Sequence, residues 1–228
     1  MAKKQKHEDP ENLQKIESSL TRAEQYIENN QKKLTYIVGV IVLLIALFFV
    51  YKNRVIEPRT ERAFEAIWGA ERLFQADSFH VALYGNENVY GFLDVISQYG
   101  STKSGNLAKY YAGICYLRMG ENDEAIKMLR SFKPRESLTA QMTANLIGDA
   151  YSNSENYQQA ARSYERAAQI SDSEEFSPLF LKKAGLCYEQ LGDKKRALEM
   201  YTEIKDRFPN TDIGREIDKY IVRVSLNK

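Results

Sequence analysis

The chain has 228 residues, and its 32 lysines and arginines are nearly balanced by 31 aspartates and glutamates. Because the two signs are interspersed, the sequence predicts no charged surface that would bind nucleic acid or select an acidic substrate. The two histidines, His7 and His80, stand in no pattern with cysteine, serine or aspartate that is typical of a catalytic or metal site. We therefore expect a protein without enzymatic activity, cofactor or bound metal.

Residues 1–33 are predicted to form an N-terminal tail and an amphipathic helix. The first eleven residues are nearly free of apolar side chains, so we expect no fixed structure in them. Apolar residues then recur every three or four positions, as on one face of a helix, at Leu13, Ile16, Leu20, Ala23 and Ile27. Contact with a membrane surface or a partner helix and simple extension of the next segment both remain open.

Residues 34–51 form an apolar run of eighteen residues without a charge, flanked by Lys33 and Lys52. As a helix the run would be about 27 Å long, which matches the hydrocarbon core of a bilayer. A cleaved signal would need a small-residue cleavage site after the run, and a buried core helix would keep a polar stripe. The sequence shows neither feature and therefore predicts an uncleaved transmembrane helix.

The charges beside this run do not predict its orientation. Three positive residues precede it within about fifteen positions, and four follow it within a similar distance. These residues are Arg22, Lys32 and Lys33 on one side and Lys52, Arg54, Arg59 and Arg62 on the other. The positive-inside rule therefore expresses no preference.

Residues 52–228 are predicted to form one helical domain, since about 175 residues are enough for a single continuous core. Pro58 is expected to begin a helix that continues to residue 76, and a second helix is expected from about residue 89 to residue 98. Between them, residues 78–88 are predicted to be a loop, with Gly85 and Asn86 suited to a positive φ. We interpret residues 59–105 as a degenerate copy of the unit that follows.

From Asn106 onward the chain repeats itself with steps of 35 and then 37 residues. The matching columns are Gly113, Gly148 and Gly185; Tyr116, Tyr151 and Tyr188; Ala125, Ala160 and Ala197; and Leu129, Tyr164 and Tyr201. These columns predict three units of two helices each, at residues 106–140, 141–177 and 178–210. An atypical last helix is expected at residues 211–226, where it would cap the array with Ile213, Ile217, Ile221 and Val224.

Small residues explain the architecture of each unit. The glycine of the first helix lets the second helix approach, and the tyrosine three residues later is expected to fill the space beside it. Gly120 and Gly192 are expected to end the first helix with a left-handed residue, whereas the middle unit has Glu155 there, so Asn153 or Asn156 is expected to take that role. Pro209 should end the last unit.

The two cysteines, Cys115 and Cys187, occupy equivalent positions of the first and third units. A whole repeat separates them, which is much farther than the roughly 7 Å between Cα atoms that a disulfide tolerates. We therefore expect two free cysteines packed as small apolar core residues.

The columns resemble the tetratricopeptide repeat, whose 34-residue pattern contains a small residue, Tyr, Gly, Ala, an aromatic residue and Pro at fixed offsets. This resemblance covers nearly all of the chain after the apolar run. It implies an all-α fold: an N-terminal amphipathic and transmembrane helix followed by a tetratricopeptide-repeat α-solenoid.

The whole arrangement resembles a narrower family, the YfgM-type ancillary subunits of the SecYEG translocon in the form found in Bacteroidetes. The phrases at residues 91–94, 99–102 and 106–113 contribute most to this similarity. The resemblance implies a single-pass protein of the inner membrane, with a cytoplasmic N-terminus and a periplasmic repeat domain. It also implies that the partners are the SecYEG translocon, a foldase of the PpiD type and emerging secreted polypeptides.

By the usual geometry of the repeat, the first helices line a concave protein-binding groove. The expected groove residues are Tyr110, Ile114, Leu117 and Arg118 in the first full unit, Asn145, Asp149 and Ser152 in the second, and Lys182, Leu186 and Glu189 in the third. This lining lacks the Lys and Asn set with which some co-chaperone repeats bind a C-terminal carboxylate. A translocon accessory scaffold is the leading hypothesis, and an assembly factor for the outer membrane or cell wall and a receptor facing the cytosol are the alternatives.

Overall fold

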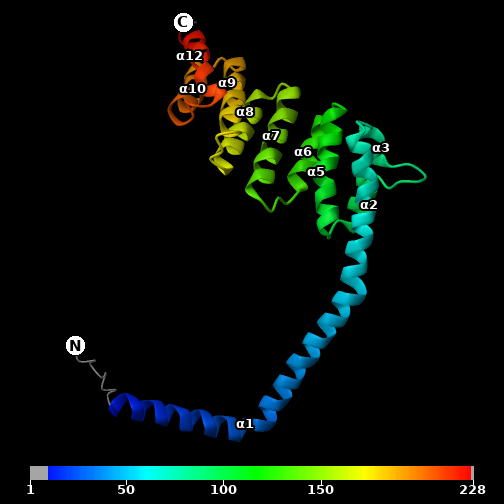
Figure 1. Ribbon diagram of the computed structural model, residues 1–228, viewed down its shortest axis with the longest axis vertical. Coiled ribbons are helices and arrows are strands. Elements are labelled where there is room, and N and C mark those ends of the chain that lie inside the picture. Colours follow the sequence, from blue (N-terminus) through cyan, green and yellow to red (C-terminus); the bar gives the residue numbers. More distant parts are fainter. Residues whose placement is uncertain (1–9, 227–228) are drawn as a thin grey trace, which may run out of the picture. The chain divides into compact units, whose positions relative to one another are not determined.

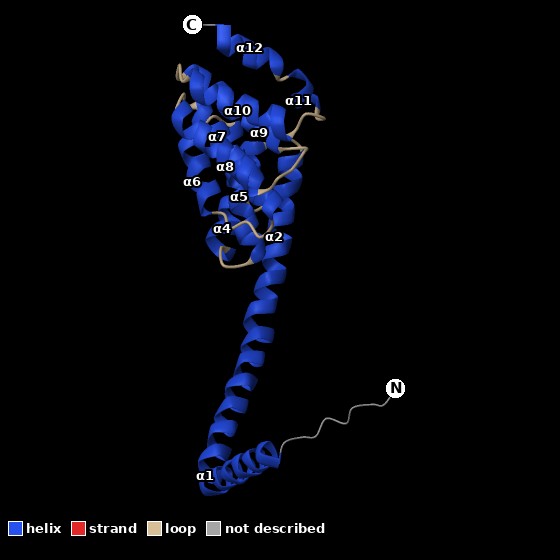
Figure 2. Ribbon diagram, turned by 90° about the vertical axis from the view of Figure 1, so that its left-hand side faces the viewer, coloured by secondary structure: helices blue, strands red, loops and turns tan. Residues whose placement is uncertain are grey.

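A computed structural model of the chain describes residues 10–226, with the surroundings of side chains from residue 26 onward. The described residues are helical apart from short turns and loops, and no strand occurs among them (Figure 2). The predicted all-α fold is therefore confirmed. The chain divides into two compact units, Met1–Pro58 and Arg59–Lys228.

The first unit is dominated by helix α1, Pro10–Tyr51, which contains both the predicted amphipathic segment and the apolar run. The side chains of Leu13, Ile16, Leu20 and Ala23 lie outside the described part. None of the side chains at residues 34–51 is buried. This region is the one described helix that is long and apolar enough to cross a bilayer, as judged by length and composition.

The expectation that Pro58 begins a new helix is wrong. Helix α1 continues through a π-helical turn, Lys52–Ile56, into helix α2, Glu57–Gln75. In the wide turn, the amide of Glu57 donates to the carbonyl of Lys52, five residues earlier. Proline has no amide hydrogen to donate, and a local π-helical adjustment is one way for a helix to accommodate the freed backbone groups.

The second unit is an array of antiparallel helix pairs (Figure 1). Its helices after α2 are α3 Phe79–Tyr84, α4 Phe92–Tyr99, α5 Lys103–Arg118, α6 Asn122–Ser131, α7 Ser137–Asn153, α8 Tyr157–Ile170, α9 Ser177–Gln190, α10 Lys194–Arg207, α11 Asp212–Glu216 and α12 Asp218–Leu226. The pairs α5–α6, α7–α8 and α9–α10 are the three predicted repeats. Helix α10 ends two residues before Pro209.

The region upstream of the repeats differs from the expectation in one respect. Part of the predicted loop at residues 78–88 forms the short helix α3, which buries Ala82 and Leu83. Gly85 follows with a φ of 76°, as expected, but Asn86 has no positive φ. The apolar side chains of α3 explain the difference, because burying them stabilises a helix of only six residues.

The hydrophobic core consists of two clusters that meet at α7. One cluster extends from α2 to α7 and includes Ala150, whereas the other extends from α7 to α12 and includes Ala144. Of the predicted capping residues, Ile217 and Val224 are buried in the second cluster, and Ile213 and Ile221 pack against it. The predicted single capping helix is instead two helices, α11 and α12, which are separated at Ile217.

Glycine allows the two helices of each repeat to approach closely, but the predicted partner is wrong. A methyl group added at Gly148 would lie 2.6 Å from Cε1 of Tyr164, which comes from the second helix of the unit. The equivalent glycines, Gly113 and Gly185, meet Leu129 and Tyr201 in the same way. The residue that fills the space is therefore sixteen positions after the glycine, rather than the tyrosine three positions after it.

The turn between the two helices is the same in all three repeats. Gly120 and Gly192 have φ values of 80° and 72°, as predicted. In the middle repeat Glu155 itself has a φ of 58°, so the expectation that Asn153 or Asn156 replaces it is wrong. The amide of Asn156 donates to the carbonyl of Tyr151 over 2.9 Å, which closes the turn that ends a helix with a left-handed residue.

Replacing Glu155 with glycine should stabilise the repeat domain. A side chain disfavours the left-handed conformation by about 1–2 kcal/mol, and the added freedom of the unfolded chain cancels part of that gain. We expect the free energy of unfolding to rise by about 0.5–1 kcal/mol in urea titrations of the detergent-solubilised chain. The control is Glu174→Gly, at an exposed loop residue without a positive φ. An equal or larger gain from the control would contradict the explanation.

Replacing Gly148 with alanine should destabilise the domain, because the added methyl group would overlap with the ring of Tyr164. Overpacking of this kind costs about 1–3 kcal/mol. The same unfolding experiment should show only a small change for Asn153→Ala, on an exposed position of the same helix. Equal stabilities of the two variants would rule out the close approach.

Candidate protein-binding groove

The ten predicted groove residues lie on the first helices of the three repeats, α5, α7 and α9. Nine of them form three columns, residues 110, 145 and 182, residues 114, 149 and 186, and residues 117, 152 and 189, and the tenth is Arg118. None of the ten side chains is buried. Their contacts, however, differ from one repeat to the next.

Asp149 joins the second repeat to the third. Its Oδ1 accepts hydrogen bonds from the hydroxyl of Tyr164, at 2.7 Å, and from Nζ of Lys183, at 2.9 Å. Asn145 completes the cluster, because its Oδ1 accepts from the same Nζ at 2.8 Å. Burial of the ring, followed by the charge of Asp149, raises the pKa of Tyr164, so its hydroxyl stays a donor.

Glu189 plays the same part between the third repeat and the capping helix α12. Its carboxylate accepts from the hydroxyl of Tyr201 and from the guanidinium of Arg223, whose Nε lies 3.1 Å from Oε2. Burial of Tyr201 and its bond to Glu189 raise the pKa of this tyrosine as well. Two successive junctions therefore use a buried tyrosine, an acid and a cation from the next element.

The sequence analysis missed the cations of both clusters. Lys183 follows Asp149 by 34 residues, and Arg223 follows Glu189 by 34 residues. An acid followed by a cation 34 residues later, at both junctions, was the available signal, and the tyrosines already belonged to a recognised column.

The junction between the first and second repeats is apolar instead. The residues equivalent to Asp149, Tyr164 and Lys183 are Ile114, Leu129 and Leu146. The same three positions therefore pack by burial at one junction and by hydrogen bonding at the next.

Three further predicted residues contact aromatic rings. The ring of Tyr110 packs on Phe132 with centroids 5.3 Å apart, and the guanidinium of Arg118 lies 5.8 Å from the ring centre of Phe79. Nζ of Lys182 lies 4.9 Å from the ring centre of Tyr220.

A cavity of about 350 Å³ lies between α7, α8 and α9 and brings together two predicted residues, Ser152 and Leu186. Its other lining residues are Tyr157, Tyr164, Lys183, Cys187 and Gln190. Leu186 is 37% exposed, whereas Asn145, Asp149 and Glu189 are already hydrogen-bonded within the chain. The accessible lining of this cavity contains no acid and mixes apolar with polar side chains.

Both cysteines are free and buried, as predicted. Burial raises the pKa of Cys115 to about 12 and that of Cys187 to about 11. Both thiols therefore stay protonated at neutral pH and are weak nucleophiles.

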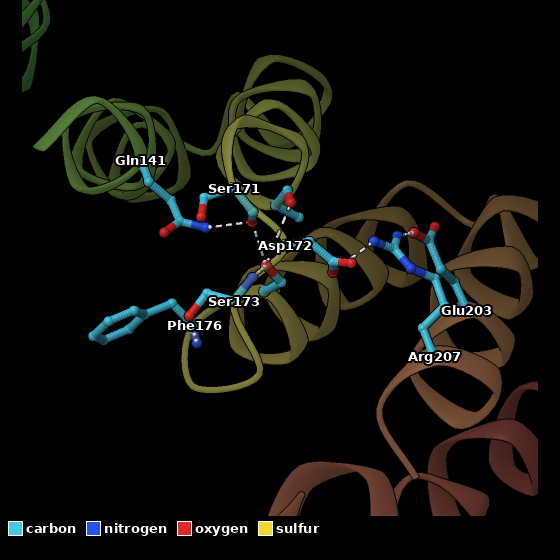
Figure 3. A network of polar contacts seen from close by, with 9 residues as sticks. Gln141, Ser171, Asp172, Ser173, Phe176, Glu203 and Arg207 are labelled. Atoms are coloured by element: carbon cyan, nitrogen blue, oxygen red, sulfur yellow. Dashed lines mark hydrogen bonds and ion pairs between the residues drawn. The ribbon is translucent and has the colours of Figure 1, made fainter. Parts of the chain in front are cut away.

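The loop between the second and third repeats fixes α9 against α7 (Figure 3). The backbone carbonyl of Ser171 accepts from the side-chain amide of Gln141 at 3.1 Å and from the hydroxyl of Ser177 at 2.8 Å. The guanidinium of Arg207 on α10 binds the carboxylate of Asp172 at 2.8 Å. These bonds come from three helices, α7, α9 and α10, and they hold the loop between the two repeats in place.

Within the described residues, no three His, Cys, Asp or Glu side chains are grouped so that they could hold a metal ion. Family models of the tetratricopeptide repeat match residues 107–133, 143–176 and 183–211. A comparison with curated proteins gives no match. The chain therefore carries three tetratricopeptide repeats, a module that typically binds protein partners and has no enzymatic activity.

Removing the carboxylate of Asp149 should weaken the junction between the second and third repeats. The Asp149→Ala variant leaves the hydroxyl of the buried Tyr164 without its acceptor, which costs about 1–3 kcal/mol. Urea unfolding should show this loss, whereas Glu124→Ala, which breaks an exposed ion pair with Lys127, should change stability by less than about 0.5 kcal/mol. Similar losses for both variants would contradict the role of Asp149.

Proposed function

We propose that the protein is a membrane-anchored scaffold whose groove binds a protein partner beside the Sec translocon of the inner membrane. The observation that carries the proposal is that one chain combines an apolar helix with no buried side chain and a repeat array. An anchored groove meets partners in the same membrane at a raised effective concentration, so a modest affinity is sufficient.

The resemblance to YfgM-type subunits supports the finer assignment. In this proposal the N-terminus is cytoplasmic, the repeat domain is periplasmic, and residues 59–105 act as a degenerate first repeat. The partners are the SecYEG translocon, a PpiD-type foldase and emerging secreted polypeptides. The exposed apolar side chain of Leu186, in a lining that also carries polar groups, fits segments of a partner that are not yet folded.

Topology is the first test of this proposal. Protease added to spheroplasts that contain the full chain should digest the repeat domain while the residues before the apolar run stay protected. The control is the same digestion after detergent permeabilisation, when both ends become accessible. A repeat domain that stays intact until permeabilisation would overturn the periplasmic assignment and support a receptor that faces the cytosol.

A photo-crosslinker at Leu186 tests the partner. In native membranes it should capture a translocon subunit, the foldase or a secreted chain, whereas a crosslinker at Lys195 should not. Lys195 is the matched control because it is exposed on the second helix of the same repeat. Equal capture from both positions would contradict binding in the groove, and capture of outer-membrane or wall assembly proteins alone would support the assembly-factor alternative.

A further inference from the structure

A second cavity, of about 230 Å³, lies outside the groove, between the second helices of the first and second repeats. It is lined by residues of α6, α7, α8 and the loop after α6. Its lining residues on α7 are Ala140, Thr143, Ala144 and Ile147. Its residues on α7 face away from Asn145 and Asp149, because positions 140, 144 and 147 lie roughly opposite positions 145 and 149 on a helix with 100° per residue.

The cavity exists because three side chains there are small. Thr143, Ala144 and Ser163 line it. The equivalent residues at the next junction, 37 positions later, are the large apolar Phe180, Leu181 and Met200, which are all buried. The core is also interrupted at this place, since the two hydrophobic clusters extend to opposite sides of it.

The charge of the rim is specific to this junction as well. Arg130 and Arg166 are exposed, and neither forms an ion pair with a carboxylate of the described chain. Their equivalents at the next junction are Glu165 and Glu203, which carry the opposite charge. No aspartate or glutamate is among the residues that line the cavity.

The walls of the cavity are held in place by contacts that need no ligand. The side-chain amide of Asn106 donates to the carbonyl of Lys133 at 2.9 Å and its oxygen accepts from the amide of Lys133 at 3.0 Å, which fixes the loop. Arg130 donates to the hydroxyl of Tyr151 at 2.8 Å and so stays at the rim. Arg166 has no such contact and is available to a bound anion.

We propose that this cavity, here called the outer-face pocket, binds a large apolar side chain that lies next to a carboxylate in a partner protein. The volume fits one side chain, because an apolar cavity of about 150 Å³ already holds benzene. The two arginines complement the negative charge of the carboxylate. The carboxylate comes either from an acidic residue inside a segment or from a chain terminus. The proposal does not depend on the proposed function, since the pocket and the groove lie on different faces of α7.

Binding to the outer-face pocket can be measured by fluorescence anisotropy, with fluorescein-labelled peptides and the full chain in detergent micelles. The peptide termini are blocked, except for the free C-terminal carboxylate of the third probe. One probe has Phe-Glu at its centre, its neutral match has Phe-Gln, and a third probe ends in Phe with a free carboxylate. We expect the Phe-Glu probe or the terminal-carboxylate probe to bind at least about tenfold more tightly than the Phe-Gln probe. The tighter of the two acidic probes identifies the source of the carboxylate.

Variants then separate recognition from folding. Arg166→Ala should weaken the acidic probe about tenfold and leave the neutral probe unchanged, whereas Arg162→Ala, at an exposed arginine one turn earlier on α8, should change neither. Ala144→Leu, which introduces the residue of the next junction, should abolish binding while the helical circular dichroism is retained.

Three results would overturn the proposal. These are equal binding of the Phe-Gln probe and the tighter of the two acidic probes, equal losses in Arg166→Ala and Arg162→Ala, and no saturable binding of either acidic probe below about 1 mM. A groove variant such as Leu186→Ala should leave the affinity of the probes unchanged, so failure of the groove and failure of the outer-face pocket remain distinguishable.

Discussion

Each repeat depends on the close contact between a glycine of its first helix and the side chain sixteen residues later on its second helix. The contact requires that the first helix has no Cβ at that position, since a methyl group would overlap with Leu129, Tyr164 or Tyr201. Because cores are packed as densely as organic crystals, the contact sets the separation of the two helices. Neighbouring repeats then stack on a surface of defined shape.

The junctions between repeats show that one backbone plan supports different chemistry. Between the first and second repeats the matching positions are apolar, whereas Asp149 and Glu189 bind a tyrosine and a cation at the later junctions. A buried hydroxyl with a charged acceptor is specific about its partner, and an apolar contact is less so. The outer-face pocket also lies at this first junction, where the core side chains are too small to fill the space.

The groove and the outer-face pocket would therefore recognise different features of a partner. The accessible groove lining around Leu186 is mainly neutral, because its acids are hydrogen-bonded within the chain, whereas the outer-face pocket has two arginines and no acid. A scaffold with two such faces could hold two segments at once, and linked binding raises the overall affinity without a larger interface at either site.

The sequence by itself determined the helical repeats and the apolar helix. These features depend on periodicity, glycine and proline, which act within one or two turns of the chain. Only the tertiary structure decided which side chains meet. Lys183 reaches Asp149 across a whole repeat, Glu155 takes the left-handed position because the turn imposes it, and Pro58 lies inside a helix. The first of these is a contact between distant residues, which local periodicity does not encode, whereas Glu155 and Pro58 are held by the backbone hydrogen bonds of the turn and the helix around them.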